Sequence, residues 1–281
     1  MRNIRLRLQY EGTRYQGWQK QTSTDNTIQG KMETLLTKMC GEPIEISASG
    51  RTDAGVHALG QVANFHTESA MSVEEILEYC NRYLPEDIAV VEVSEAAPRF
   101  HSRLYATVKR YRYRIINSQI PDVFWRRYAT EEPEELDLDA MRKAAERLLG
   151  EHDFKAFTSA KKSKKSTVRR IDEIRIERIE NRVEFVFTGN GFLHHMIRIL
   201  MGTLLEVGKG IRTPESVTDI LKSGDRAKAG ALVPAKGLVL EEVFYTGKIK
   251  ILQLFALQLR LVYCRVSFCH EIVNKSKTKC L

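Results

Sequence analysis

The chain has 281 residues, of which 43% are hydrophobic and 28% are charged, so it is long enough to fold around a sizeable core in one domain or two. Lys and Arg number 44 against 36 Asp and Glu, which gives a formal net charge of +8. This excess favours nucleic acid over an anionic membrane as a partner, although a basic protein without any charged partner is equally compatible with it. The five cysteines are odd in number and no pair has C-x-x-C spacing, which argues against a disulfide framework and a zinc site.

The N-terminal residues predict a strand. Ile4, Leu6 and Leu8 alternate with polar residues, which is the period of a strand with one buried face. No apolar signal-peptide core precedes this pattern, so we expect a cytoplasmic protein.

Helices and further strands are predicted up to residue 100. Apolar residues at helical spacing predict a helix from Ile28 to Met39 that ends at Gly41. A second helix is predicted to begin at the capping box of Ser72 and Glu75 and to end at Pro85. Apolar runs also predict strands over residues 44–47, 61–67 and 88–93.

The second half of the chain has the same mixture of patterns. A strand is predicted over 106–116, with Arg110, Arg112 and Arg114 on one face and Tyr111, Tyr113 and Ile115 on the other. The remaining predicted elements are a helix over 138–149 capped by Asp137, a hairpin that turns near Asn181, an apolar helix over 192–207, a helix opened by Thr213 and Pro214, and a strand over 237–245.

These elements predict an α+β protein with two subdomains, residues 1–100 and 101–247, whose sheets join across a central cleft. Residues 248–281 form an atypical tail that contains three of the five cysteines. Lys250, Arg260 and Arg265 interrupt its apolar run, which argues against a membrane span. Chance placement explains Cys264, Cys269 and His270 in this tail better than a metal site does.

The loop from Gly50 to Ala58 carries the strongest candidate for chemistry. A lone aspartate in a glycine-bounded turn, such as Asp53, is usually a cap for its own loop. Arg51, however, could hold this carboxylate ionised and oriented if both side chains face one pocket. The sequence shows no second acid, metal cluster or phosphate-binding loop beside it, so hydrolysis by paired acids and nucleotide-driven chemistry are disfavoured. Nucleophilic or general-base catalysis remains compatible with a single carboxylate.

The sequence Gly50-Arg51-Thr52-Asp53-Ala54-Gly55-Val56-His57-Ala58 resembles the catalytic motif of the tRNA pseudouridine synthase A family, which acts on the anticodon stem and loop. Four further blocks resemble this family in the right order over roughly residues 1–247, whereas the tail after Lys248 departs from its pattern. These blocks are residues 10–19 (YEGTRYQGWQ), 109–113 (KRYRY), 190–198 (NGFLHHMIR) and 237–240 (GLVL).

The resemblance implies the pseudouridine synthase fold with mostly antiparallel sheets, and an isomerase that converts uridine to pseudouridine in tRNA without a cofactor. By the same resemblance Asp53 is the catalytic carboxylate, and Tyr111 stacks on the extruded uracil and is a candidate to accept the C5 proton. Arg198 would pair with Asp53, Arg51 would occupy the space that the base leaves, and Leu238 would wall the pocket. The resemblance also implies a homodimer that binds tRNA, rather than a partner of DNA or membranes.

Several of these residues have a simpler interpretation. Tyr111 and Tyr113 on one strand face are more often plain core residues. His194 and His195 look like a metal pair, but adjacent positions on a helix point about 100° apart, so we expect no metal site. Arg198 within an apolar helix is harder to explain without function, because a buried guanidinium needs a partner.

Positive charge predicts the RNA-contacting surfaces. Its densest run is either a solvated loop or a mobile RNA-binding loop. The residues predicted to contact RNA are Lys161, Lys162, Lys164 and Lys165 in this run, with Arg110 and Arg112 on the tyrosine strand. The main alternative function is a non-catalytic RNA-binding or RNA-folding protein on the same scaffold. A DNA-binding protein is less favoured, because no helix-turn-helix, zinc-finger or basic-zipper signature is present.

Overall fold

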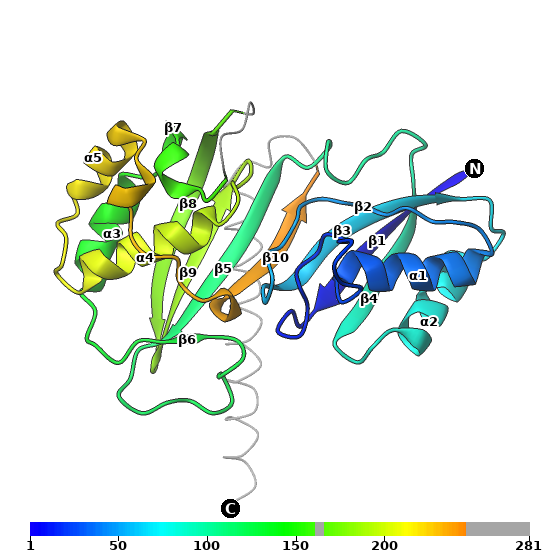
Figure 1. The fold of residues 1–281 in the computed structure, drawn as a ribbon, viewed down its shortest axis with the longest axis horizontal. Helices are drawn as coiled ribbons and strands as arrows, with labels where there is room; N and C mark the ends of the chain where they lie inside the picture. Colours follow the sequence, from blue (N-terminus) through cyan, green and yellow to red (C-terminus); the bar gives the residue numbers. More distant parts are fainter. Residues whose placement is uncertain (161–165, 246–281) are drawn as a thin grey trace, which may run out of the picture. The chain divides into compact units, whose positions relative to one another are not determined.

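The computed structural model describes residues 1–160 and 166–245. The predicted RNA contacts of Lys161, Lys162, Lys164 and Lys165 therefore lie outside the described residues, as does the predicted tail 248–281. Residues 1–245 form one compact unit, in which helices flank the two ends of a long sheet (Figure 1).

The first half of this unit contains four strands and two helices. They are β1 (Arg2–Tyr10), α1 (Ile28–Cys40), β2 (Ser47–Ala48), β3 (His57–Thr67), α2 (Val73–Tyr83) and β4 (Ile88–Ala96). The predicted ends of α1 are confirmed by its left-handed C-cap Gly41, and the Ser72–Glu75 capping box opens α2 as expected. The strand predicted over 44–47 is wrong in its bounds, because only Ser47 and Ala48 pair with β3.

The second half alternates strands and helices less regularly. Its elements are β5 (Val108–Ile116), β6 (Thr130–Glu131), α3 (Leu138–Glu146), β7 (Gly150–Asp153), β8 (Val168–Ile179), β9 (Arg182–Gly189), α4 (Met196–Gly208), α5 (Ser216–Ser223) and β10 (Leu238–Phe244), with three single-turn 3-10 helices at Lys155–Phe157, Arg226–Lys228 and Ala235–Gly237. Asp137 caps α3 as predicted, since its carboxylate accepts from the backbone N–H groups of Asp139 and Ala140.

Two predicted helix starts are wrong. The apolar helix α4 begins at Met196 rather than at 192, because His195 has the left-handed φ of 63° and cannot continue a helix in the N-terminal direction. Thr213 does not cap α5, which begins at Ser216; the Ser216 hydroxyl instead donates to the Thr213 carbonyl at 2.7 Å. In both places a local turn determines the start, and apolar spacing alone does not reveal it.

The strands form a single ten-stranded sheet in the order β4-β1-β3-β10-β5-β9-β8-β7, with β2 and β6 paired at its margins to β3 and β5. The α+β class with a mostly antiparallel sheet is therefore confirmed. β10 comes last in the described chain, yet it lies in the middle of the sheet (Figure 1). It is parallel to β3 of the first half and antiparallel to β5 of the second, so it joins the two halves.

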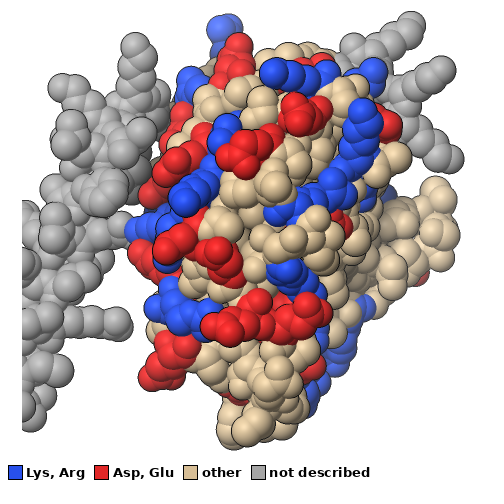
Figure 2. Space-filling model, turned by 90° about the vertical axis from the view of Figure 1, so that its left-hand side faces the viewer, with Lys and Arg blue, Asp and Glu red and all other residues tan. Residues whose placement is uncertain are grey.

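The hydrophobic core is built from the alternate apolar residues of the strands and from the apolar helix α4. Ile4, Leu6 and Leu8 of β1 are fully buried, and eleven of the thirteen residues of α4 are buried. No described helix is both long enough and apolar enough to cross a bilayer. The face seen in Figure 2 carries intermingled blue and red side chains rather than one broad basic surface.

Candidate active site

A cavity of about 1200 Å³ brings together residues from both halves of the sheet. Its walls include the loop that carries Asp53, the start of β5, the residues around the start of α4, and Leu238 at the start of β10. All five residues predicted for the site, Asp53, Arg51, Tyr111, Arg198 and Leu238, line this cavity. The two halves meet here because β10 alone lies between β3 and β5 in the sheet.

The Asp53 loop is a tight turn supported from beneath. The Val56 N–H donates to the Asp53 carbonyl at 3.1 Å, and Gly55 adopts a φ of 77° that other residues rarely take. Gly17 packs so closely beneath the turn that a Cβ there would lie 2.8 Å from the Thr52 carbonyl oxygen. The Trp18 N–H also donates to that carbonyl at 3.0 Å. The segment 12–19 therefore holds the backbone of the catalytic candidate in place.

Buried polar side chains hold the other flank of the loop. The Tyr10 and Thr52 hydroxyls are 2.8 Å apart, and Gln61 donates to the Gly50 carbonyl at 2.9 Å. The Ser49 hydroxyl in turn donates to the Gln61 side chain at 2.6 Å. Burial raises the pKa of Tyr10 to about 12, so this phenol remains a neutral hydrogen-bonding group. Because every member is partnered, the network rigidifies the loop.

Among the described lysines and arginines, Arg198 is the one closest to Asp53. Its Nη1 lies 3.5 Å from the Asp53 Oδ2, and its Nε donates to the Val233 carbonyl at 2.8 Å. The guanidinium side chain is 12% exposed, so this loose ion pair is only weakly screened by solvent.

His194 and His195 converge on Asp53, and the expectation that they diverge is wrong. The His194 Nε2 lies 3.8 Å from Oδ1 and the His195 Nε2 lies 3.7 Å from Oδ2, with the ring centroids 3.7 Å apart. The 100° rule applies only within a helix, whereas both residues precede α4 and His195 has a left-handed backbone. Such strain in a residue other than glycine is common at functional sites.

These three side chains could each offer one ligand atom to a metal ion, since the atoms lie within 4.8 Å of one another. Burial lowers the pKa of His195, which keeps its imidazole neutral more readily than in water. The guanidinium of Arg198 already lies beside the same carboxylate, and its charge would repel a cation there.

Tyr111 presents an aromatic ring to the cavity and is 8% exposed. Its ring packs edge to face against Phe192, with centroids 5.3 Å apart. Burial is the main cause that raises the pKa of the Tyr111 phenol, and the nearby charge of Asp53 adds to it. The phenol is therefore neutral at ordinary pH. Tyr113 is buried away from the cavity, and its hydroxyl donates to the Pro234 carbonyl at 2.9 Å.

The predicted basic residues Arg51, Arg110 and Arg112 lie in two different environments. Arg51 lines the cavity and is exposed. Arg110 and Arg112 are not among the described residues that line it. Arg112 is ion-paired with Glu184 and, at 2.5 Å, with Glu241, while Arg110 lies 3.6 Å from Glu242. Their contact with RNA stays a prediction, and their carboxylate partners already offset their charge.

Two residues of the site are not evident as candidates from the sequence. The apolar pattern assigns Phe192 to a helix, yet this residue precedes α4 and packs on Tyr111. Lys109 lies two residues before Tyr111 on the same strand face and also lines the cavity. The strand alternation was a signal that could have identified Lys109.

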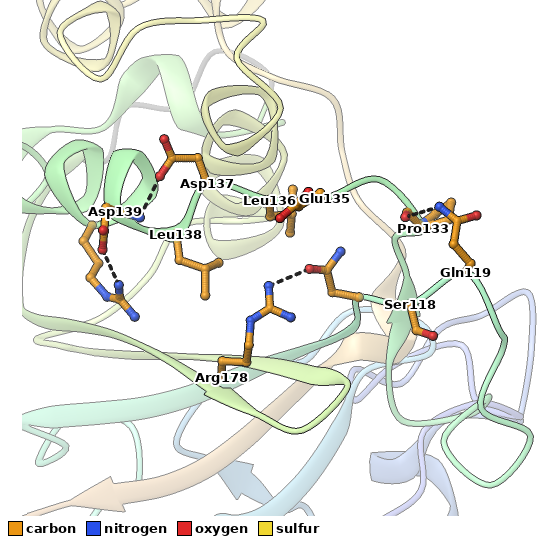
Figure 3. Close-up of a pocket in the computed structure, with 11 residues that line it drawn as sticks. Ser118, Gln119, Pro133, Glu135, Leu136, Asp137, Leu138, Asp139 and Arg178 are labelled. Carbon is orange, nitrogen blue, oxygen red and sulfur yellow. Dashed lines mark hydrogen bonds and ion pairs between the residues drawn. The ribbon is translucent and has the colours of Figure 1, made fainter.

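A second hollow, of about 700 Å³, lies between the segment 133–139 and the end of β8 (Figure 3). Both arginines that line it have side-chain partners within it. Arg178 donates to the Asn117 side chain at 2.8 Å, and Arg142 pairs with Asp139 at 2.6 Å. This hollow lies apart from Asp53, and the described residues that line it include no comparable group of reactive side chains.

The sequence matches a family model described as tRNA pseudouridine synthase over residues 8–104 and 144–246. It is 48% identical to tRNA pseudouridine synthase A of Bacillus sp. (strain KSM-64) over 245 residues, which are 87% of this chain and 100% of that protein. It is 44% identical to tRNA pseudouridine synthase A 2 of Clostridium perfringens (strain 13 / Type A), with the same coverage. The solved structure titled "Crystal Structure of a Cbf5-Nop10-Gar1 Complex" is similar with a TM-score of 0.32 and 14% identity, over 63% of this chain and 40% of that one, which is too little to support an argument.

Proposed function

The chain belongs to the tRNA pseudouridine synthase family, and we propose that it modifies uridines in the anticodon stem and loop of tRNA with Asp53 as the catalytic carboxylate. As a member of this family, the protein is an isomerase that converts uridine of tRNA to pseudouridine. The reaction breaks the bond between C1′ and N1, turns the uracil and joins C1′ to C5. It involves no net oxidation or reduction.

One observation carries the assignment of Asp53. Among the described residues that line the cavity, Asp53 is the only acidic one. A carboxylate that faces an anionic RNA opposes binding, so a protein that only binds RNA gains nothing from it. A carboxylate in a rigid loop, beside a partly buried arginine, is suited to act as a nucleophile or general base. The non-catalytic alternative is therefore not favoured.

The surrounding residues support the extruded nucleotide. The target base must leave its stack, which costs a few kcal/mol, and an aromatic pocket recovers part of this energy. Tyr111 offers its ring to the uracil, and because its phenol is neutral it must release its own proton before it can accept the one from C5. Leu238 forms an apolar wall, Arg198 pairs with Asp53, and the exposed Arg51 occupies the space that the base vacates.

Asp53→Asn tests the catalytic assignment. The substitution removes the carboxylate charge and keeps the side-chain size, so we expect no pseudouridine formation above background, with tRNA affinity within about twofold of the parent because binding depends on Lys and Arg contacts to phosphate. The measurements are product formation in single-turnover assays and equilibrium tRNA binding.

The matched control is Asp219→Asn, which removes an exposed carboxylate from α5 and should leave both quantities unchanged. Thermal melts of both variants establish that they are folded. Product formation by Asp53→Asn near the parent rate would remove Asp53 from the mechanism.

We also propose that the protein is a cytoplasmic homodimer that shares a tRNA between its subunits. The dimer is supported by exposed apolar side chains on the loop between β5 and β6, where Ile120, Val123 and Phe124 are 76%, 61% and 85% exposed. Sedimentation equilibrium should give twice the chain mass, and subcellular fractionation should recover the protein with the cytosol. A monomer at micromolar concentration would contradict the dimer.

A further inference from the structure

Within the described part of the chain, four positively charged side chains line the active-site cavity without forming an ion pair to a carboxylate. Arg51 belongs to the Asp53 loop, and the other three are Arg103, just before β5, Lys109 within β5, and Arg169 in β8. Among the described residues, the lysines that form ion pairs are Lys20 and Lys209, and Lys109 is not one of them. The arginines on the other face of β5 have carboxylate partners, as Arg112 has in Glu184 and Glu241. The cavity face of the same strand thus differs from its opposite face in carrying unbalanced positive charge.

Lys109 is the central member of this group. Its ammonium donates to the Ser49 carbonyl at 2.6 Å, and a Cβ added to Gly50 would lie 2.9 Å from its Nζ. Burial, with smaller contributions from the charges of Arg103 and Arg169, lowers the pKa of Lys109 to about 8. Burial also lowers the pKa of Arg169. The folded protein therefore holds Lys109 and Arg169 where their charge is disfavoured.

An anion that binds in the cavity would relieve this unfavourable arrangement, and the tRNA substrate supplies phosphates. We propose that Lys109, Arg103 and Arg169 form a subsite for one phosphodiester group of the RNA, next to the nucleotide whose base contacts Tyr111. The proposal rests on the assignment of this cavity as the site that accepts the extruded uridine. The proposal thus assigns contact with the RNA backbone to the cavity face of β5 rather than to the face that carries the ion-paired Arg110 and Arg112.

The position of Lys109 suits this role. Residues two apart on one strand face are separated by roughly 7 Å, so Lys109 and Tyr111 can contact the phosphate and the base of the same nucleotide. Because the ammonium also binds the Ser49 carbonyl, which precedes Asp53 in the same loop, a phosphate held there would be in fixed register with the catalytic loop. Charge-assisted hydrogen bonds of this kind are shorter and stronger than neutral ones.

A test of this subsite removes either member of the proposed pair, the Lys109 ammonium or the RNA phosphate. The first is Lys109→Met, which keeps the length of the side chain and removes its charge. The second is a tRNA anticodon stem-loop in which a neutral methylphosphonate replaces one phosphodiester next to the target uridine. Binding of each combination is measured in the Asp53→Asn background, so that affinity is read separately from chemistry.

We expect each single change to weaken binding roughly tenfold. The double combination should be no weaker than either single change, because both remove the same interaction. Lys109→Met should also reduce the slope of log K against log salt by roughly 0.7. Lys109→Arg should restore most of the affinity. The matched control, Lys143→Met on the exposed surface of α3, should change binding less than about twofold.

Additive reductions in affinity in the double combination would show that Lys109 only supports the loop through Ser49, and would overturn the proposal. If Lys109→Met fails to fold, as judged by its thermal melt, the methylphosphonate scan of the Asp53→Asn protein decides. In that case the proposal would be overturned if binding stays unchanged when each phosphodiester beside the target uridine is neutralised in turn. Activity of Asp53→Asn, in contrast, would contradict only the catalytic assignment.

Discussion

His57 illustrates how a single side chain near the catalytic loop connects burial, tautomer and stability. Its Nδ1 accepts from the Gly12 N–H at 3.0 Å, so the ring must be neutral with its proton on Nε2. That Nε2 can donate to the Arg127 carbonyl at 2.9 Å or the Lys236 carbonyl at 3.1 Å. The ring thereby links the end of the loop to residues from both halves of the sheet.

The protonation of His57 predicts a loss of stability in acid. Burial lowers its pKa from the usual 6.5, even though Glu11 partly opposes this shift. Below pH 6.5 the unfolded chain binds a proton that the folded protein does not, so the free energy of unfolding falls as the pH falls toward the folded-state pKa. The slope from one such group is at most about 1.4 kcal/mol per pH unit.

His57→Gln should therefore have a lower free energy of unfolding at pH 7.5 and a flatter pH dependence below pH 6.5. Part of the slope should persist, because the pKa of His195 is lowered too. Urea unfolding between pH 5 and 7.5 measures both quantities. His66→Gln, at an exposed position, is the control and should keep the parent slope. An unchanged slope in His57→Gln would show that its burial does not affect acid stability.

At the scale of elements, α4 shows why a helix can both fill a core and carry active-site residues. Its buried faces pack against the rest of the second half, while its first turn meets the cavity through Arg198. The two histidines that precede it are placed by a backbone turn rather than by helical periodicity. Arg198 and the two histidines thus reach the cavity from the beginning of a buried helix, where side-chain positions are precise.

The run of lysines between β7 and β8 in the sequence is predicted to contribute to tRNA binding. Lys161, Lys162, Lys164 and Lys165 lie outside the described residues, but their charge is plain from the sequence. Replacing all four with Ala should weaken tRNA binding and flatten its salt dependence, by roughly 0.7 to 0.9 in the slope of log K against log salt for each phosphate that the variant no longer binds. Fluorescence binding titrations at several salt concentrations measure this slope. An unchanged slope would identify the run as a solvated loop.

At the scale of the whole molecule, the continuous sheet creates the site. β10 inserts between β3 and β5, so the Asp53 loop from the first half and Tyr111 from the second face one cavity. The expected boundary near residue 100 falls between β4 and β5, and the division into two subdomains stays a prediction. A strand from the end of the second half binds both halves together, so their opening would require breaking backbone hydrogen bonds on at least one side of β10.

The tail, residues 248–281, is predicted to be dispensable for activity and stability. Residues 1–245 form a compact unit whose last strand ends at Phe244, and curated relatives match over 245 residues. We therefore expect that truncation after Gly247 leaves activity and thermal stability unchanged and increases solubility, because it removes an apolar, cysteine-containing segment. Activity assays, melting curves and light scattering measure these outcomes. A fall in stability of several kcal/mol would instead place the tail within the fold.

Local patterns in the sequence determined much of this protein. Alternation, capping residues and glycines predicted most elements, since these depend on neighbours within a few residues. The isolated Asp53 in a glycine-bounded turn, and an arginine within an apolar helix that needed a partner, were visible for the same reason. Resemblance to a family then supplied the roles that no single residue could show.

Tertiary structure alone decided what depends on residues distant in the chain. The position of β10 follows from its pairing with β3, which lies far earlier in the chain, and no local pattern records it. The partners of Arg112 come from β9 and β10, so only the folded sheet shows that its charge is offset. The convergence of His194 and His195 required a left-handed residue where periodicity suggested a helix. Lys109 became a candidate for phosphate binding only once folding had buried its ammonium in the cavity, where none of the described carboxylates forms an ion pair with it.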